Sequence, residues 1–154
     1  FPASLGNLSS LEKLSIAYNH LEGSITPALG RLSNLIFLSL AVNNLSGQVP
    51  PSFYNLSNIQ ILVITENQLV GTLLFNIPMA FPNLQRFGCG MNQFTGTFPS
   101  AITNLSELQV FDIDKNYFHG PIPPTPGSLH KLHHFNIEHN RFGSGRADDL
   151  KKIS

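Results

Sequence analysis

The sequence contains few charged residues and no long apolar run. Charged side chains make up 12% of its 154 residues and the net charge is zero, against about 25% charged residues in an average soluble protein. We expect no nucleic-acid partner, since binding to nucleic acid requires a basic face. No apolar run approaches the roughly 18 residues of a membrane-spanning helix. Any membrane attachment therefore has to come from a span that this chain does not contain.

The motifs of common catalytic sites are also missing. There is no phosphate-binding loop, no zinc-ligand spacing and no kinase catalytic signature. The segment Gly88-Cys89-Gly90 lacks the third glycine of a dinucleotide-binding loop. We therefore expect no enzymatic activity in this chain, no cofactor and no metal ion.

Histidines gather near the end of the sequence, at His130, His133, His134 and His139. Adjacent residues of a strand point to opposite faces, so His133 and His134 are not expected to share a metal ion. We interpret the group as ordinary solvated side chains.

Asparagine recurs at intervals of 24 or 25 residues, at Asn19, Asn43, Asn67, Asn92, Asn116 and Asn140. A fixed period of about 20–29 residues with leucines and one asparagine per period is the signature of a leucine-rich repeat. A buried asparagine needs hydrogen-bond partners for its amide. We expect each side chain to bond backbone groups of its own coil and of the next, which would form a ladder along the stack.

Apolar residues stand at fixed distances before each asparagine. Five residues before it are Leu14, Leu38, Leu62, Phe87, Phe111 and Phe135, and three residues before it are Ile16, Leu40, Ile64, Cys89, Ile113 and Ile137. A separation of two residues places both side chains on one face of a strand. We expect this face to be the interior, with Cys89 as a buried structural thiol, and the residues between to face outward.

The second half of each period follows the pattern Leu-x-Gly-x-Ile-Pro, as in residues 45–50, 94–99 and 118–123. With the Leu-x-x-Leu that follows, it resembles the plant-type leucine-rich repeat over the whole chain. The resemblance implies an α/β-type solenoid with a parallel concave β-sheet and a convex side of loops, short strands and 3₁₀ turns. The departures are Thr26 and Leu74 in the proline slot, Pro126-Gly127 in place of a leucine, and one extra residue between Gly71 and Leu84.

We interpret the chain as a single repeat domain. Its units are a half repeat at 1–10, repeats at 11–34, 35–58, 59–83, 84–107 and 108–131, and an irregular repeat at 132–154. Residues 1–9 match residues 98–106 in phase, so the sequence opens inside a repeat. Solenoids need capping repeats, and in the resembling plant proteins these carry paired cysteines. We therefore expect an uncapped internal fragment of a longer protein.

The tail at residues 143–153 resembles the longer, irregular repeat of one plant receptor-kinase subfamily, which includes receptors for bacterial flagellin and elongation-factor peptides. Asp148 and Asp149 are expected to start a short helix there, with Leu150 and Ile153 turned inward.

Asn-x-Ser sequons occur at Asn7, Asn44, Asn55 and Asn104. In a secreted protein such a motif is an acceptor for N-linked glycans on the surface. Asn-Leu-Ser is also common at this phase of the repeat consensus, so the motif alone does not decide. With the family resemblance, we expect glycosylation of at least two of the four.

Outward residues of the expected strands are the candidate ligand-binding residues. One group forms an expected apolar patch: Phe37, Val42, Ile61, Val63 and Met91. A second group forms an expected acidic zone: Asp112, Asp114 and Glu138. The remaining candidates are Glu66, Arg86 and His134. Exposed apolar patches commonly mark partner sites, and a peptide with an apolar segment followed by a basic one would suit this face. Gly88 and Gly90 are expected to leave a dent between the two zones.

The resemblance implies an extracellular segment of a plant receptor-like kinase. It would recognise a peptide or protein ligand in defence or developmental signalling, at the outer side of the plasma membrane, and members of the family commonly recruit a co-receptor kinase. A secreted inhibitor of fungal cell-wall-degrading enzymes, located in the cell wall, is an alternative, as are a receptor-like protein without a kinase and a cytosolic scaffold. A downstream apolar span of about 20 residues followed by kinase motifs would separate the first reading from the others.

Overall fold

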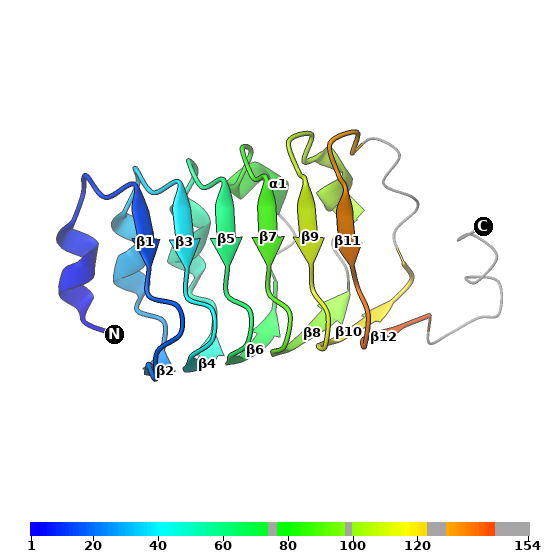
Figure 1. The fold of residues 1–154 in the computed structure, drawn as a ribbon, viewed down its shortest axis with the longest axis horizontal. Helices are drawn as coiled ribbons and strands as arrows, with labels where there is room; N and C mark the ends of the chain where they lie inside the picture. The colour runs from blue at the N-terminus through cyan, green and yellow to red at the C-terminus, as the bar shows by residue number, and fades with distance from the viewer. Residues whose placement is uncertain (74–76, 98–99, 123–128, 144–154) are drawn as a thin grey trace.

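The computed structural model describes residues 1–73, 77–97, 100–122 and 129–143 (Figure 1). The chain winds into successive coils. Each coil contributes a strand to the front of the molecule and a second strand along one edge, and helical turns lie at the back over the described residues up to Asn104. The N-terminus lies at one end of the row of coils (Figure 1). The predicted Leu74, Pro126-Gly127 and the tail from 144 onward lie outside the described residues.

A parallel six-stranded sheet forms the front of the molecule, in the order β1-β3-β5-β7-β9-β11. Its strands are β1 (Lys13–Ser15), β3 (Phe37–Ser39), β5 (Ile61–Val63), β7 (Arg86–Gly88), β9 (Val110–Asp112) and β11 (His134–Asn136). The register pairs residues of equal repeat phase, such as Leu14 with Leu38 and Phe87 with Phe111. The predicted leucine-rich-repeat solenoid is therefore confirmed.

A second parallel sheet follows one edge of the solenoid, in the order β12-β10-β8-β6-β4-β2. Its strands are β2 (Glu22–Ser24), β4 (Asn44–Gln48), β6 (Gln68–Thr72), β8 (Gln93–Thr97), β10 (Tyr117–Gly120) and β12 (Arg141–Phe142). A glycine with positive φ lies in the first five of these strands, for example Gly47 at 76°. Glycine adopts this conformation without steric cost, so the strand can bend around the edge of the coil.

Short helical turns form the back of the solenoid (Figure 1). Four are 3₁₀ helices: η1 (Ala3–Asn7), η2 (Pro27–Arg31), η3 (Pro51–Asn55) and η4 (Ser100–Asn104). The third repeat instead has a short α-helix, α1 (Ile77–Ala80). In η3 the closing bond runs from Leu56 N–H to Phe53 O, three residues back, whereas after α1 Phe81 N–H donates to Ile77 O, four residues back. The extra residue of this repeat is thus absorbed by a change from a 3₁₀ to an α turn.

Leucines and phenylalanines from every described coil share one continuous core. Two rows of stacked rings run along it. In the first, Phe111 lies 5.6 Å from Phe87 and 5.7 Å from Phe135 between ring centroids. In the second, Phe118 stacks with Phe94 and Phe142. Identical slots in consecutive coils bring like side chains into contact, so the phenylalanines of the later repeats stack on one another.

The repeated asparagines bond the coils to one another. Asn92 is typical: its Nδ2 donates to Cys89 O and Gly90 O in its own coil and to Ile64 O in the preceding coil, at 3.0–3.2 Å. Its Oδ1 accepts from Leu69 N–H at 3.0 Å. The partner coil is the preceding one, whereas the expected partner was the next coil. Asn43, Asn67, Asn116 and Asn140 repeat this pattern.

The residue before each asparagine has a positive φ, as Val42 does at 56°. For a β-branched residue this is a strained conformation. Asn43, the residue that follows Val42, donates three hydrogen bonds from its side-chain amide, and these bonds hold the turn in place. As a result, the alternation of side chains along the front strand ends before these residues.

Candidate functional site

The outward surface of the front sheet, which we call the strand face, presents three rows of side chains. The first row is Lys13, Phe37, Ile61, Arg86, Val110 and His134, and the second is Ser15, Ser39, Val63, Gly88, Asp112 and Asn136. A third row follows the strands and includes Thr65, Gly90 and Asp114. Because strands in a sheet lie about 4.8 Å apart, neighbours in a row can contact one ligand together.

An open groove of about 600 Å³ lies over β1, β3 and β5. It is lined by Lys13, Ser15, Ile36, Phe37, Gln60 and Ile61. Phe37 and Ile61 are register partners and both are partly exposed. An apolar pair that remains in water at the front of the sheet is available to a partner.

The other residues of the expected apolar patch do not join this groove. Val42 lines a different depression of about 280 Å³, together with Glu66 and the asparagines at the turn. Met91 is 39% exposed, also at a turn with positive φ. Val63 lines the hollow described below. The structure therefore divides the patch, because the backbone turns before Val42 and Met91.

The carboxylates of the expected acidic zone make contacts within the chain. Asp112 Oδ2 lies 3.8 Å from His134 Nε2, which makes an ion pair when the imidazole is protonated. Asp112 Oδ1 also accepts from Asp114 N–H at 3.1 Å. Glu138 is exposed, and its N–H donates to Asn136 Oδ1 in the same way.

Only half of the expected dent remains open. A Cβ atom on Gly90 would overlap the Asp114 carboxylate, so this side chain fills the space that the glycine leaves. At Gly88 the nearest atoms to such a Cβ are Thr65 Oγ1 at 3.1 Å and Val63 Cγ1 at 3.5 Å. A Cβ at Gly88 would thus touch Thr65 closely without overlapping any atom, so this side of the dent is less filled than the side at Gly90.

Packing against Gly90 changes the acidity of Asp114. Burial raises the pKa of this carboxyl, and the charge of Asp112 and a side-chain hydrogen bond to it raise the pKa further. Lys115 and His139 act in the opposite direction. Ionised Asp114 therefore opposes folding, because a raised pKa in the folded state means that this state binds the proton more tightly than the unfolded chain does.

We expect Asp114→Asn to stabilise the protein at pH 7, because the amide keeps a donor for Asp112 and carries no charge. The destabilisation by ionised Asp114 is fully present above its folded pKa, and it disappears as the pH falls through that value to the ordinary 3.8. Urea unfolding of both proteins from pH 7 to pH 3.5 should thus give curves that converge on acidification. Glu22→Gln, which changes an exposed carboxylate on β2, is the control. Equal pH profiles for wild type and Asp114→Asn would contradict the assignment.

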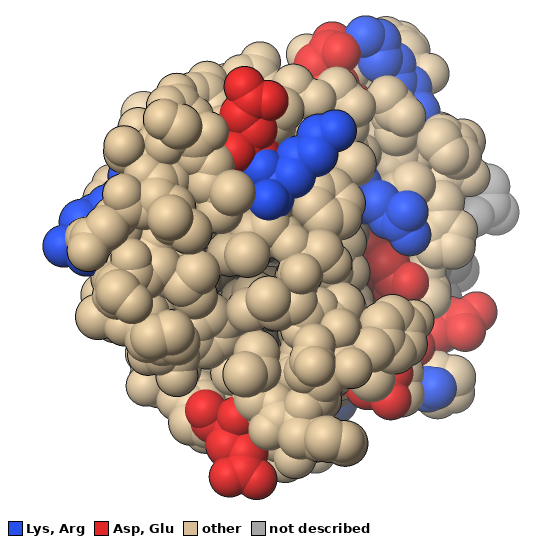
Figure 2. All heavy atoms as spheres, turned by 60° about the vertical axis from the view of Figure 1, so that its left-hand side comes forward, with Lys and Arg blue, Asp and Glu red and all other residues tan. Residues whose placement is uncertain are grey.

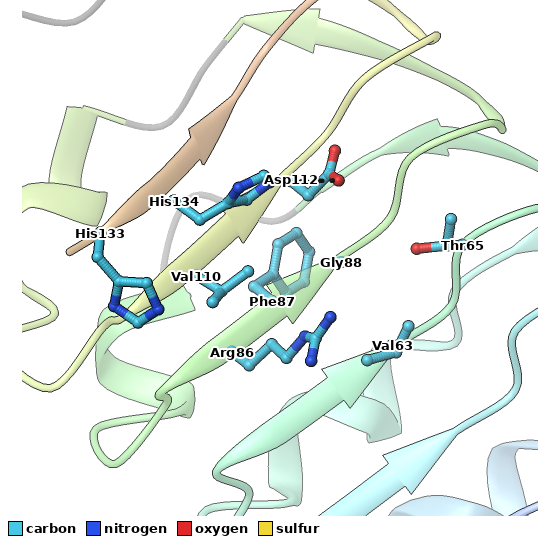
Figure 3. Close-up of a pocket in the computed structure, with 9 residues that line it drawn as sticks. All are labelled: Val63, Thr65, Arg86, Phe87, Gly88, Val110, Asp112, His133 and His134. Atoms are coloured by element: carbon cyan, nitrogen blue, oxygen red, sulfur yellow. Dashed lines mark ion pairs between the residues drawn. The ribbon is translucent and has the colours of Figure 1, made fainter.

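A hollow of about 330 Å³ opens beside Gly88. Figure 3 shows the side chains of Arg86, Thr65 and Asp112 around the bare backbone at this glycine, with Val63, Val110 and His134 completing the wall. Arg86 and Asp112 come from neighbouring strands, β7 and β9, and Thr65 follows β5. A cation, an anion and a hydroxyl group thus face the same space.

Four residues that line the hollow were not among the candidate ligand-binding residues: Thr65, Phe87, Val110 and His133. Thr65 lies two residues after Val63, so strand alternation places both side chains on the outward face. The sequence therefore contained a signal for counting Thr65 among the candidate residues. His133 lines the hollow together with His134, although alternation predicted opposite faces. The prediction was wrong because β11 begins at His134, so strand alternation does not extend to His133. No group of three metal-ligating side chains occurs among the described residues.

Charges are sparse on the molecular surface. Figure 2 shows basic and acidic side chains scattered singly and in small groups over the visible face, with uncharged surface between them. Among the helices of the described residues, none has the length and apolar character that a bilayer span requires.

Cys89 is fully buried in its interior slot. Burial raises the pKa of the thiol well above its usual range, and the nearby charges of Asp112 and Asp114 add to the effect. A thiol in such surroundings is a poor nucleophile. Cys89 fills a core slot that holds isoleucine or leucine in the other coils, so its role is to pack the interior.

The four sequon asparagines are all exposed. Asn7, Asn55 and Asn104 are the last residues of η1, η3 and η4, on the back of the solenoid. Asn44 is the first residue of β4. Their side chains are away from the hollow and from the Phe37–Ile61 groove.

Comparison with known proteins agrees with this architecture. Residues 10–32 and 34–56 match the Leucine Rich Repeat family, and the search of curated protein sequences gives no match. The plant peptide hormone receptor RGFR1, solved in complex with RGF2, is 32% identical with a TM-score of 0.87. The match covers 92% of this chain and 23% of that chain.

Two solved structures from Arabidopsis are also similar. The ectodomain of the receptor kinase HAESA, in complex with an IDA peptide hormone ligand, is 29% identical with a TM-score of 0.86, over 92% of this chain and 23% of that one. The ectodomain of the receptor kinase SOBIR1 is 27% identical with a TM-score of 0.78, over 84% and 71%. The present chain thus spans less than a quarter of RGFR1 and of HAESA as solved.

The fold and the matched repeats define this chain as a leucine-rich-repeat solenoid. More particularly, it has plant-type repeats and is similar to the ectodomains of plant receptor kinases.

Proposed function

We propose that this chain is part of the extracellular ligand-recognition region of a plant receptor kinase, and that a peptide ligand lies across its strand face. The observation that carries the proposal is the groove at Phe37 and Ile61, where apolar side chains remain partly exposed on an otherwise regular sheet. The similarity to RGFR1 and HAESA, both solved with peptide hormones, supports it.

The parent protein of this proposal is anchored by one span in the plasma membrane and carries a cytoplasmic Ser/Thr kinase, both outside this chain. It acts in defence or developmental signalling and pairs with a co-receptor kinase once the ligand is bound. The structure of HAESA with IDA and the co-receptor SERK1 supports such pairing. Sequencing the complete reading frame tests the anchor and the kinase, and a stop codon directly after the repeats would contradict both.

N-linked glycans on at least two of Asn7, Asn44, Asn55 and Asn104 belong to the same proposal. Their exposure on the back and edge of the solenoid supports it, because glycans there leave the strand face open. Mass spectrometry of protein secreted from plant cells tests this, and four unmodified asparagines would exclude it.

Selection of a displayed random peptide library on the immobilised chain tests ligand binding. We expect recovered peptides to lose at least tenfold in affinity for the double variant Phe37→Glu/Ile61→Glu, because two charges then replace the apolar pair in the groove. The control is Gln68→Glu/Gln93→Glu, which adds the same two charges at exposed positions of β6 and β8.

Circular dichroism of each variant checks that folding is retained. Peptides that bind the Phe37→Glu/Ile61→Glu variant as well as wild type would show that the groove is not the binding site. A library that yields no binding peptide would reject peptide recognition by this chain.

A further inference from the structure

The polar groups around Gly88 have room for further partners. Among the described residues, no carboxylate lies within ion-pair distance of Arg86. The Asp112 carboxylate lies 3.8 Å from His134 Nε2 and accepts from Asp114 N–H, and a carboxylate with these contacts has lone pairs left for a further donor. The Thr65 hydroxyl makes no side-chain hydrogen bond to the described part of the chain. Arg86 is exposed and Asp112 is partly exposed, so water solvates their charged groups and a polar ligand can replace that water with bonds of its own.

Gly90 offers an internal comparison for what such a space accepts. Two residues after Gly88, the room left by the missing side chain is occupied by a carboxyl group, that of Asp114. Asp112 borders both spaces, and its charge contributes to the raised pKa of Asp114. A planar polar group therefore fits beside a glycine of this strand, but full ionisation is disfavoured next to Asp112.

We propose that the hollow at Gly88 binds the carboxamide side chain of an asparagine or glutamine in a peptide that crosses the strand face. The carboxamide oxygen accepts from the Arg86 guanidinium and the Thr65 hydroxyl, and its NH₂ group donates to the Asp112 carboxylate. This rests on the proposed function, since it assumes a peptide on the same face, and it adds which side chain the site selects.

The charges around the hollow favour a carboxamide over other side chains. A carboxylate would be attracted by Arg86 but repelled by Asp112, and an ammonium group would meet the reverse. An aliphatic side chain would cover both charged groups without bonding to them, which is costly. A carboxamide is neutral and has both an acceptor and donors, so it can satisfy the cation and the anion together.

The hollow can be closed by one substitution. Gly88 has no positive φ, and the same slot holds Val63 in β5 and Asp112 in β9, so a side chain is compatible with the backbone. We therefore expect Gly88→Val to fill the hollow and to retain the fold after a small shift of the Thr65 side chain, whose Oγ1 lies 3.1 Å from the Cβ position. Gly88→Ala, whose Cβ meets Thr65 Oγ1 at 3.1 Å, is a milder second variant.

The peptide library provides the test. Selection on the immobilised wild-type chain, with soluble Gly88→Val in excess, retains only peptides that need the hollow. We expect these peptides to share one asparagine or glutamine position. Synthetic peptides with Gln, Glu, Lys or Leu at that position should bind wild type at least tenfold more tightly with Gln than with any of the other three.

Two charge variants should change this preference in opposite directions. Asp112→Asn leaves Arg86 unopposed, so Glu should replace Gln as the preferred residue. Asn136 in β11 shows that asparagine can accept the same backbone bond in this slot. Arg86→Gln leaves Asp112 unopposed, so Lys should be preferred. Arg31→Gln, which makes the same exchange at an exposed position of η2 on the back of the solenoid, should leave the preference for Gln unchanged.

The outcomes separate this inference from the proposed function. If selection recovers peptides without soluble Gly88→Val but none in its presence, no peptide depends on the hollow. That result would overturn the carboxamide site and leave peptide recognition intact. Hollow-dependent peptides that prefer Glu, Lys or Leu with wild type, or whose preference does not respond to Asp112→Asn and Arg86→Gln, would overturn it as well. No recovered peptide under either condition would reject both. If Gly88→Val does not fold, Gly88→Ala serves as the competitor.

Discussion

Replacing Asn92 with alanine is expected to lower the free energy of unfolding by about 3 kcal/mol, since a buried polar group left without a partner costs roughly 1–3 kcal/mol. The asparagine is 7% exposed, and its loss leaves Leu69 N–H without an acceptor. Ile64 O and Cys89 O keep a second donor, from Asn67 and Asn116 respectively. The loss should therefore remain below the sum of four hydrogen bonds. Urea denaturation measures it.

Asn19→Ala is the matched control for Asn92→Ala. Asn19 is exposed, and its side-chain amide donates to Ile16 O and Ala17 O of its own coil, so about 0.5 kcal/mol is expected for an exposed hydrogen bond. Asn92→Asp should destabilise more than alanine does, because an ionised carboxylate faces three carbonyl oxygens. Equal losses for Asn19→Ala and Asn92→Ala would mean that bonds between coils add nothing to stability.

Phe111→Ala is expected to cost about 4 kcal/mol, as truncation of a buried phenylalanine usually costs 3–5 kcal/mol. The ring is 1% exposed and stacks on Phe87 and Phe135. Its removal leaves a cavity in the middle of the row, where neither neighbouring ring can move in without leaving its own slot. Thermal or urea unfolding of the purified variant gives the difference.

Two further substitutions test whether stability at this position depends on filling the apolar slot or on stacking between aromatic rings. Phe111→Leu should cost about 1 kcal/mol, because exchanges between large apolar side chains are tolerated and leucine fills this slot at Leu14, Leu38 and Leu62. Phe135→Ala should cost about half as much as Phe111→Ala, since Phe135 is already 37% exposed and its area buried is smaller. A loss for Phe111→Leu as large as that for Phe111→Ala would show that an aromatic ring is specifically required.

The period of the sequence predicts which residues become neighbours, but not how deeply each is buried. Leu38 and Phe111 are covered by coils on both sides and are fully buried, whereas Leu14 and Phe135 occupy the same slot in the outer described coils and are partly exposed. Burial in a solenoid depends on the adjacent coils, and a pattern within one repeat does not contain that information.

The sequence predicts less of the candidate site than of the fold. Alternation placed Phe37, Ile61 and Val63 on the strand face, but it fails at Val42 and Met91, where φ is positive and the strand has ended. The closure of the space at Gly90 depends on the rotamer of Asp114 in the next coil. Such contacts between coils are set by the geometry of the stack, and a one-letter pattern does not encode them.

The α turn of the third repeat shows that the back of a coil tolerates a change in length that the front sheet does not share. Although Ile61 and Arg86 are one residue further apart in sequence than other neighbouring pairs, they are still aligned in the sheet. The back of a coil can thus vary in length while the front retains its alignment. Insertions behind the sheet could alter solubility, glycan spacing or lateral contacts and leave ligand selectivity unchanged, whereas a single-residue shift within a front strand would exchange the surface that meets the ligand for the one that holds the coils together.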